Sequence, residues 1–155
     1  MLQSDRTHLT DIAQVLAIAV VLSSLAAGVV GAAYWWLVRA ERLPWVLIRG
    51  AQIVAGIQAV GAGLLAIGGL SPDDELYWLY AVLPVAIGFF AEQIKLVSAQ
   101  SVLDARGLAD GAAVAELPAD RQRSVVTAIM RRELGVMVVA AFVVVFLALR
   151  ALGTL

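Results

Sequence analysis

Four apolar stretches, each long enough to cross a membrane as a helix, dominate this sequence and constrain its fold more than any other feature. They cover about residues 10–38, 45–70, 76–96 and 128–149. A bilayer core of roughly 30 Å requires about 20 helical residues, which each stretch supplies. The first stretch is too long for a cleavable signal peptide, and no basic segment precedes it. The sequence therefore predicts four transmembrane helices.

The composition indicates the same class of protein. Hydrophobic residues make up 62% of the chain, against roughly 45–50% in soluble domains. A soluble protein of 155 residues has too little interior to bury so much apolar surface. Lipid must therefore cover much of it. The net charge of -1 gives no reason to expect a nucleic acid as a partner.

The residues that carry most enzyme and metal chemistry are scarce. The chain has no cysteine and one histidine, His8, which excludes disulfides, thiolate metal sites and a bis-histidine haem site within one chain. The run GAGLLA at residues 61–66 matches the spacing of a dinucleotide-binding loop, but it lies inside an apolar stretch with no strand before it. The sequence has no GxSxG, P-loop or HExxH motif. We therefore expect no catalytic residue, no metal and no cofactor.

The connections between the apolar stretches indicate how the helices are joined. The first connection is short, so the first two helices should be antiparallel neighbours. In the third connection, about residues 99–125, we expect the third helix to stop near Gly107 and a new helix to start around Pro118. We predict an all-α integral membrane protein with a single domain, residues 1–155. Its four transmembrane helices form an antiparallel up-down bundle, with a helical cytoplasmic extension between spans three and four.

The basic residues predict the orientation of the bundle. Nine of the eleven lie at the first and third connections, and only Arg6 and Arg150 lie on the other side. Cytoplasmic connections carry an excess of lysine and arginine. We expect an integral protein of a bacterial plasma membrane, with these two connections in the cytoplasm and both termini outside.

Small residues recur at helical spacing on each predicted helix, and they allow close helix packing in lipid. The stripes are Ala13, Ala17, Val20, Ser24, Ala27 and Gly31 on the first helix; Arg49, Gln52, Gly56, Ala59, Gly63 and Ala66 on the second; Ala81, Pro84, Gly88 and Ala91 on the third; and Ser124, Ala128, Arg131 and Gly135 on the fourth. The fourth helix is bulky beyond Gly135. We expect its outer half to face lipid or another subunit, and we expect self-association or a partner membrane subunit.

Polar residues of three helices reach a similar depth near the inner membrane boundary. At a rise of about 1.5 Å per residue, Glu92 lies roughly 24 Å inward from Leu76. Residues of the second and fourth helices reach the same level. The candidate polar cluster consists of Arg49, Gln52, Glu92, Gln93, Lys95, Arg131, Arg132 and Glu133.

Two interpretations of this cluster are open. In the structural one, Glu92 is held by Arg49 or Arg131, while Arg132 and Lys95 meet lipid phosphates. In the functional one, the cluster lines a cavity open to the cytoplasm. That cavity would bind an anionic headgroup, a small polar solute or a proton.

Gln58 is the strongly polar residue near the midplane of the second helix. We expect its amide to form a hydrogen bond to a neighbouring helix, with Ser23 or Ser24 of the first helix as the partner. A pore is the weaker interpretation, because no ring of carboxylates lies at this depth in the sequence.

Three classes of function follow from these features. The favoured one is a non-enzymatic subunit, scaffold or lipid-binding module, which uses the small-residue stripes and binds anionic headgroups near the arginines. The second is a small transporter or channel with a cytoplasmic-facing site around Glu92 and Arg49. The third is a membrane enzyme acting on a lipid-soluble substrate.

Overall fold

The computed structural model of the chain describes residues 2–39 and 41–155, with side chains from residue 7 onward. Within these ranges the chain is entirely helical and contains no strand. The helices are α1 (Leu2–Leu37), α2 (Leu43–Ile67), α3 (Leu76–Asp104), α4 (Gly111–Ala115) and α5 (Ala119–Leu152). Four of them, α1, α2, α3 and α5, are long and apolar enough to cross a membrane. The prediction of four long apolar helices is thus confirmed.

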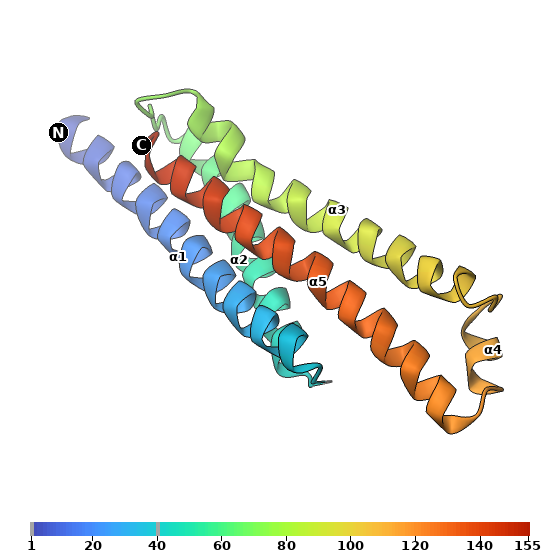
Figure 1. Ribbon diagram of the computed structural model, residues 1–155. Coiled ribbons are helices and arrows are strands. Elements are labelled where there is room, and N and C mark those ends of the chain that lie inside the picture. Colours follow the sequence, from blue (N-terminus) through green and yellow to red (C-terminus); the bar gives the residue numbers. More distant parts are fainter. Residues whose placement is uncertain (1, 40) are drawn as a thin grey trace.

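The two termini lie near each other at one end of the molecule, and α4 lies at the opposite end (Figure 1). There α3 and α5 extend past the connection between α1 and α2 (Figure 1). Each long helix packs against two others: α5 lies between α1 and α3, while α2 contacts α1 and α3 on the other side.

Buried side chains form successive layers along the bundle. Near the termini, Ala13 of α1 packs with Ala62 of α2, Ala81 of α3 and Ala151 of α5. Toward the other end, a second layer contains Ala27 of α1, Ile48 and Ala51 of α2, Ala91 of α3, and Leu134 and Met137 of α5. The layers are rich in alanine, and such small side chains let helix backbones approach closely.

The predicted stripes on α1 and α3 face the interior. On α1, Ala13, Ala17, Val20, Ser24, Ala27 and Gly31 are all buried. On α3, Ala81, Pro84 and Ala91 are buried and Gly88 is half-buried.

The predicted stripe on α2 is wrong by about one residue. Its buried positions are Pro44, Ile48, Ala51, Ala55, Gln58, Ala62 and Leu65, whereas Gly63 and Ala66 are exposed. A Cβ atom added at Gly56 or Gly63 would meet no atom within 4 Å. These two glycines therefore do not mediate close packing within the chain.

The outer half of α5 has both a packed and an exposed face. Val144, Ala148 and Ala151 are buried against the other helices, whereas Phe142, Val143, Phe146 and Leu149 are exposed. Ser124 and Arg131, which belonged to the predicted packing stripe, are exposed.

The extension beyond the bundle is closed by α4, a short helix that the sequence did not predict. The α3 helix ends at Asp104, and Gly107 then adopts a positive φ of 68°, which glycine tolerates without strain. Asp110 caps α4 by accepting a hydrogen bond from the Ala113 backbone N–H at 3.0 Å. A small apolar core, Leu103, Val114 and Val125, joins α3, α4 and α5. The extension is therefore a packed unit.

Candidate functional site

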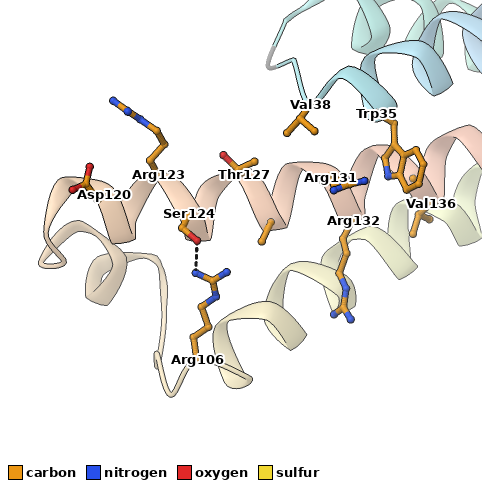
Figure 2. Close-up of a pocket in the computed structure, with 12 residues that line it drawn as sticks. Trp35, Val38, Arg106, Asp120, Arg123, Ser124, Thr127, Arg131, Arg132 and Val136 are labelled. Atoms are coloured by element: carbon orange, nitrogen blue, oxygen red, sulfur yellow. Dashed lines mark hydrogen bonds between the residues drawn. The ribbon is translucent and has the colours of Figure 1, made fainter.

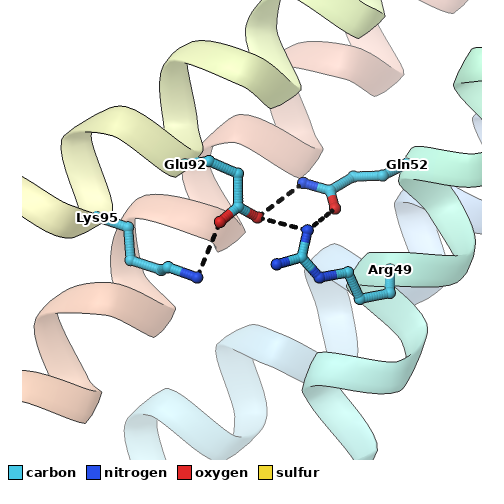
Figure 3. Close-up of polar contacts among 4 residues, drawn as sticks. All are labelled: Arg49, Gln52, Glu92 and Lys95. Atoms are coloured by element: carbon cyan, nitrogen blue, oxygen red, sulfur yellow. Dashed lines mark hydrogen bonds and ion pairs between the residues drawn. The ribbon is translucent and has the colours of Figure 1, made fainter.

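Glu92 of α3 lies at the centre of a compact group of polar side chains between α2 and α3 (Figure 3). Arg49 Nη1 lies 2.9 Å from Glu92 Oε1, and Lys95 Nζ lies 2.8 Å from Glu92 Oε2. The amide of Gln52 donates to Oε1 at 3.2 Å and accepts from Arg49 at 2.8 Å. We call Arg49, Gln52, Glu92 and Lys95 the ion-pair cluster. Both oxygens of the carboxylate are engaged in it.

The Lys95 side chain is largely buried beside Glu92. It is 17% exposed, and Nζ lies 5.4 Å from the centroid of the Trp45 ring. Glu133 of α5 is close enough to interact electrostatically with Lys95 and Glu92. Within the described chain, Lys95 thus pairs with Glu92.

The other members of the predicted cluster lie elsewhere. Gln93 is exposed, next to Glu92 in sequence but on a different face of α3. Arg131, an expected partner of Glu92, instead lies over Trp35, and Arg132 donates to the hydroxyl of Ser101. The structure therefore separates the predicted set into the ion-pair cluster and a second group of arginines on α5.

Gln58 is fully buried, and neither its amide nitrogen nor its amide oxygen has a hydrogen-bond partner within the described part of the chain. The expected bond to Ser23 or Ser24 is not formed. Ser23 donates instead to the carbonyl of Val20, one turn earlier on its own helix. Such a buried, unpartnered amide costs about 1–3 kcal/mol.

An open hollow of about 880 Å³ runs along the first turns of α5 (Figure 2). Four of its side chains are arginines, and one, Asp120, is a carboxylate. We call it the arginine hollow. Its lining consists of Trp35, Val38, Arg106, Asp120, Arg123, Ser124, Thr127, Ala128, Arg131, Arg132, Gly135 and Val136.

The indole of Trp35 forms an aromatic wall of the arginine hollow. The guanidinium carbon of Arg131 lies 4.9 Å from the Trp35 ring centroid, a cation–π contact. One turn further along α5, a Cβ atom at Gly135 would lie 3.1 Å from Trp35 Nε1. The absence of a side chain at Gly135 therefore lets the ring lie against α5, with the charge of Arg131 beside it.

Hydroxyl groups, not carboxylates, hold two of the arginines. Arg106 Nη1 donates to Ser124 Oγ at 3.0 Å, and Arg132 donates to Ser101 Oγ. Among the side chains of residues 7–39 and 41–155, both ion pairs are made by Glu92, so none of the four hollow arginines has a carboxylate partner there. With four arginines and one carboxylate, Asp120, in its lining, the hollow carries a net positive charge.

Sequence reasoning missed Arg106, Arg123 and Trp35 as neighbours of Arg131. A signal was present: Arg123, Thr127, Arg131 and Gly135 follow one another at intervals of four residues, which places them on one helix face. The contribution of Arg106 depends on the turn after α3, and spacing along α5 does not reveal it.

A second recess, of about 240 Å³, opens beside the ion-pair cluster between α2 and α3. It shares Gln52, Pro84 and Gly88 with an inner cavity of about 30 Å³ that Ser24 also lines. The inner cavity has room for a water molecule or two. This pair of spaces is the structural feature that bears on the transporter alternative.

No protein-family model, curated protein or solved structure matches this chain. The function is therefore inferred from the two polar groups themselves.

Proposed function

We propose that this chain is an integral membrane protein that binds lipids with anionic headgroups at the arginine hollow, and that it catalyses no reaction. In this proposal, the four long helices cross the membrane as an antiparallel up-down bundle, with the hollow on the cytoplasmic side. The observation that carries the proposal is the set of four arginines, Arg106, Arg123, Arg131 and Arg132, that line one hollow without a carboxylate partner in the described chain.

The chemistry of the hollow matches a phosphate group. The planar guanidinium of arginine binds phosphate oxygens with two parallel hydrogen bonds. Tryptophan side chains favour the level of the lipid headgroups, where Trp35 would lie at the edge of the apolar part of α1. Glu92 is bound to Arg49 and Lys95, and Asp120, the carboxylate in the lining of the hollow, forms no ion pair with these arginines among the described side chains.

Small transport or channel activity is the second candidate, supported by the recess beside Glu92 and the inner cavity behind it. The engagement of both Glu92 oxygens within the chain favours the lipid-binding role. Self-association with a second copy or a partner subunit stays a prediction.

The proposal is tested by titrating the detergent-purified protein with phosphatidylglycerol and phosphatidylcholine and measuring bound lipid by native mass spectrometry. We expect preference for phosphatidylglycerol. An arginine near a charged membrane surface contributes about 1 kcal/mol. Arg123→Gln and Arg131→Gln should therefore each weaken phosphatidylglycerol binding about fivefold.

Arg121→Gln is the matched control, because Arg121 lies on the same helix but does not line the arginine hollow. It changes the net charge equally and should keep wild-type affinity. Glu92→Gln should also keep that affinity while lowering thermal stability, since Arg49 and Lys95 lose their shared partner. Equal losses in Arg121→Gln and Arg131→Gln, or no preference between the two lipids, would refute the proposal.

A further inference from the structure

Resting on the proposed lipid-binding function, we infer that the site takes a whole phospholipid, with one acyl chain held along α5 in an apolar groove that continues from the arginine hollow. The groove has a volume of about 470 Å³ and lies between α3 and α5. It shares Gly135 and Val136 with the arginine hollow. We call it the chain groove, and its walls include Ile87, Phe90, Ile94, Val136, Val139 and Val143.

The α5 wall of the groove lies on the same helix face as a hollow arginine. Val136, Val139 and Val143 follow Arg132 at intervals of four, seven and eleven residues. Residues at these intervals lie one above another on an α-helix. A headgroup at Arg132 is therefore in line with a chain lying over the three valines.

The α3 wall has the same arrangement. Ser101, Ile94, Phe90 and Ile87 are separated by seven, four and three residues and share one face of α3. The hydrogen bond between Arg132 and Ser101 joins the two helices one turn of α5 before Val136, which the groove shares with the arginine hollow. The polar end and the apolar channel thus belong to one continuous feature.

The length and the lining of the groove fit an acyl chain. From Arg132 to Val143 the helix rises about 17 Å, comparable to the roughly 15 Å of hydrocarbon in one leaflet. The floor contains the small residues Ala91, Gly135 and Ala140, while Phe90 and Val139 are 60% and 64% exposed at its rim. The four arginines at one end select a lipid whose headgroup is anionic.

The test fills the groove without changing the arginines. Val139→Trp introduces a bulky side chain at an exposed rim position, and Val60→Trp, at a 66% exposed position on α2, is the matched control. If the tryptophan displaces two methylene groups of the acyl chain from the groove, lipid binding should weaken about tenfold. We therefore expect Val139→Trp to bind dioleoyl phosphatidylglycerol about tenfold more weakly than wild type by native mass spectrometry. Val60→Trp should keep wild-type affinity.

Soluble glycerol 3-phosphate separates the headgroup from the chain. It should bind more weakly than the lipid and equally to wild type and Val139→Trp, because the arginine hollow is unchanged. Equal affinity of lipid and glycerol 3-phosphate, or wild-type lipid binding by Val139→Trp, would overturn the chain groove. If Arg131→Gln still weakens lipid binding in that case, the proposed function stands; if it does not, both proposals fall.

A second measurement keeps the inference testable if Val139→Trp folds poorly. Phosphatidylglycerol with a diazirine in its acyl chain should label the wild-type protein within residues 87–94 and 136–143. Labelling spread evenly over the exposed faces of α1 and α2 would contradict a held chain and indicate general membrane lipid.

Discussion

Glu92 and Gln58 are both polar residues within long apolar helices, and their surroundings differ sharply. Glu92 contacts Arg49, Gln52 and Lys95, which satisfy both carboxylate oxygens. Gln58 is fully buried and has no partner for either amide atom among the described residues. Glu92 therefore links α2 to α3. The unsatisfied amide of Gln58 instead lowers the free energy of unfolding of the bundle.

Replacing Gln58 by methionine should stabilise the protein. The two side chains are similar in shape, and the substitution removes an unsatisfied buried amide. We expect the free energy of unfolding to rise by about 1 kcal/mol, measured by thermal unfolding in detergent. Gln52→Met is the matched control, and it should destabilise, because the Gln52 amide bonds to Glu92 and Arg49. If both variants lose stability equally, the Gln58 amide has a hydrogen-bond partner, such as a water molecule.

Among the elements, α5 is the helix on which the arginine hollow and the chain groove depend. It contacts both α1 and α3 and contributes most of the arginine hollow. Close approach between α1 and α5 depends on glycines of both helices, Gly28 and Gly31 on α1 and Gly135 on α5. At Gly31 an added Cβ would lie 2.7 Å from Val138 Cγ2, and Gly135 meets Trp35 in the same manner.

Gly31→Ala should therefore destabilise the contact between α1 and α5. Val138 has a stiff β-branched side chain that cannot move aside easily, so overpacking should cost about 1–3 kcal/mol. Gly56→Ala on α2 is the control: its Cβ would meet nothing within 4 Å, and alanine favours the helix by up to about 1 kcal/mol. Thermal unfolding of the two variants in the same detergent measures the difference. Equal melting temperatures would show that the α1–α5 contact is looser than described.

At the scale of the whole molecule, the sequence predicts the positions of the long helices well. It predicts less well which face of each helix points into the bundle. Length and hydropathy locate the four long helices, and small residues mark the inner faces of α1 and α3. On α2, small residues occur on both faces, such as Ala55 and Gly63. In lipid both faces are apolar, so composition does not distinguish the packed face from the exposed one.

The candidate site shows the same limit. From the sequence, helical rise predicts that Glu92, Arg131 and Arg132 lie at a similar depth. Consecutive residues differ by about 100° around the axis, so depth does not assign partners. Arg131 thus lies over the Trp35 ring, Arg132 donates a hydrogen bond to Ser101, and Lys95 forms an ion pair with Glu92. The short helix α4 is below the length at which hydrophobic periodicity is informative.

The orientation of the bundle is a prediction that the chain is well suited to test. Because the sequence has no cysteine, a single introduced cysteine is the unique target of a membrane-impermeant maleimide. Ser71→Cys lies in the α2–α3 connection, and Ala112→Cys lies on the exposed side of α4. The positive-inside rule predicts labelling of the first in intact cells, and of the second only after permeabilisation. The reverse pattern would place both termini in the cytoplasm.

On the proposed membrane role, the packed extension formed by α3, α4 and α5 would make the protein sensitive to the thickness of the bilayer. Both long helices continue from the bundle into the extension, where Leu103, Val114 and Val125 pack them together through α4. The length of the two helices therefore sets how far Arg106 and Arg123 lie from the apolar part of the bundle. A thicker bilayer would bring its phosphates toward these two arginines, and a thinner one would leave the phosphates nearer Arg131 and Arg132.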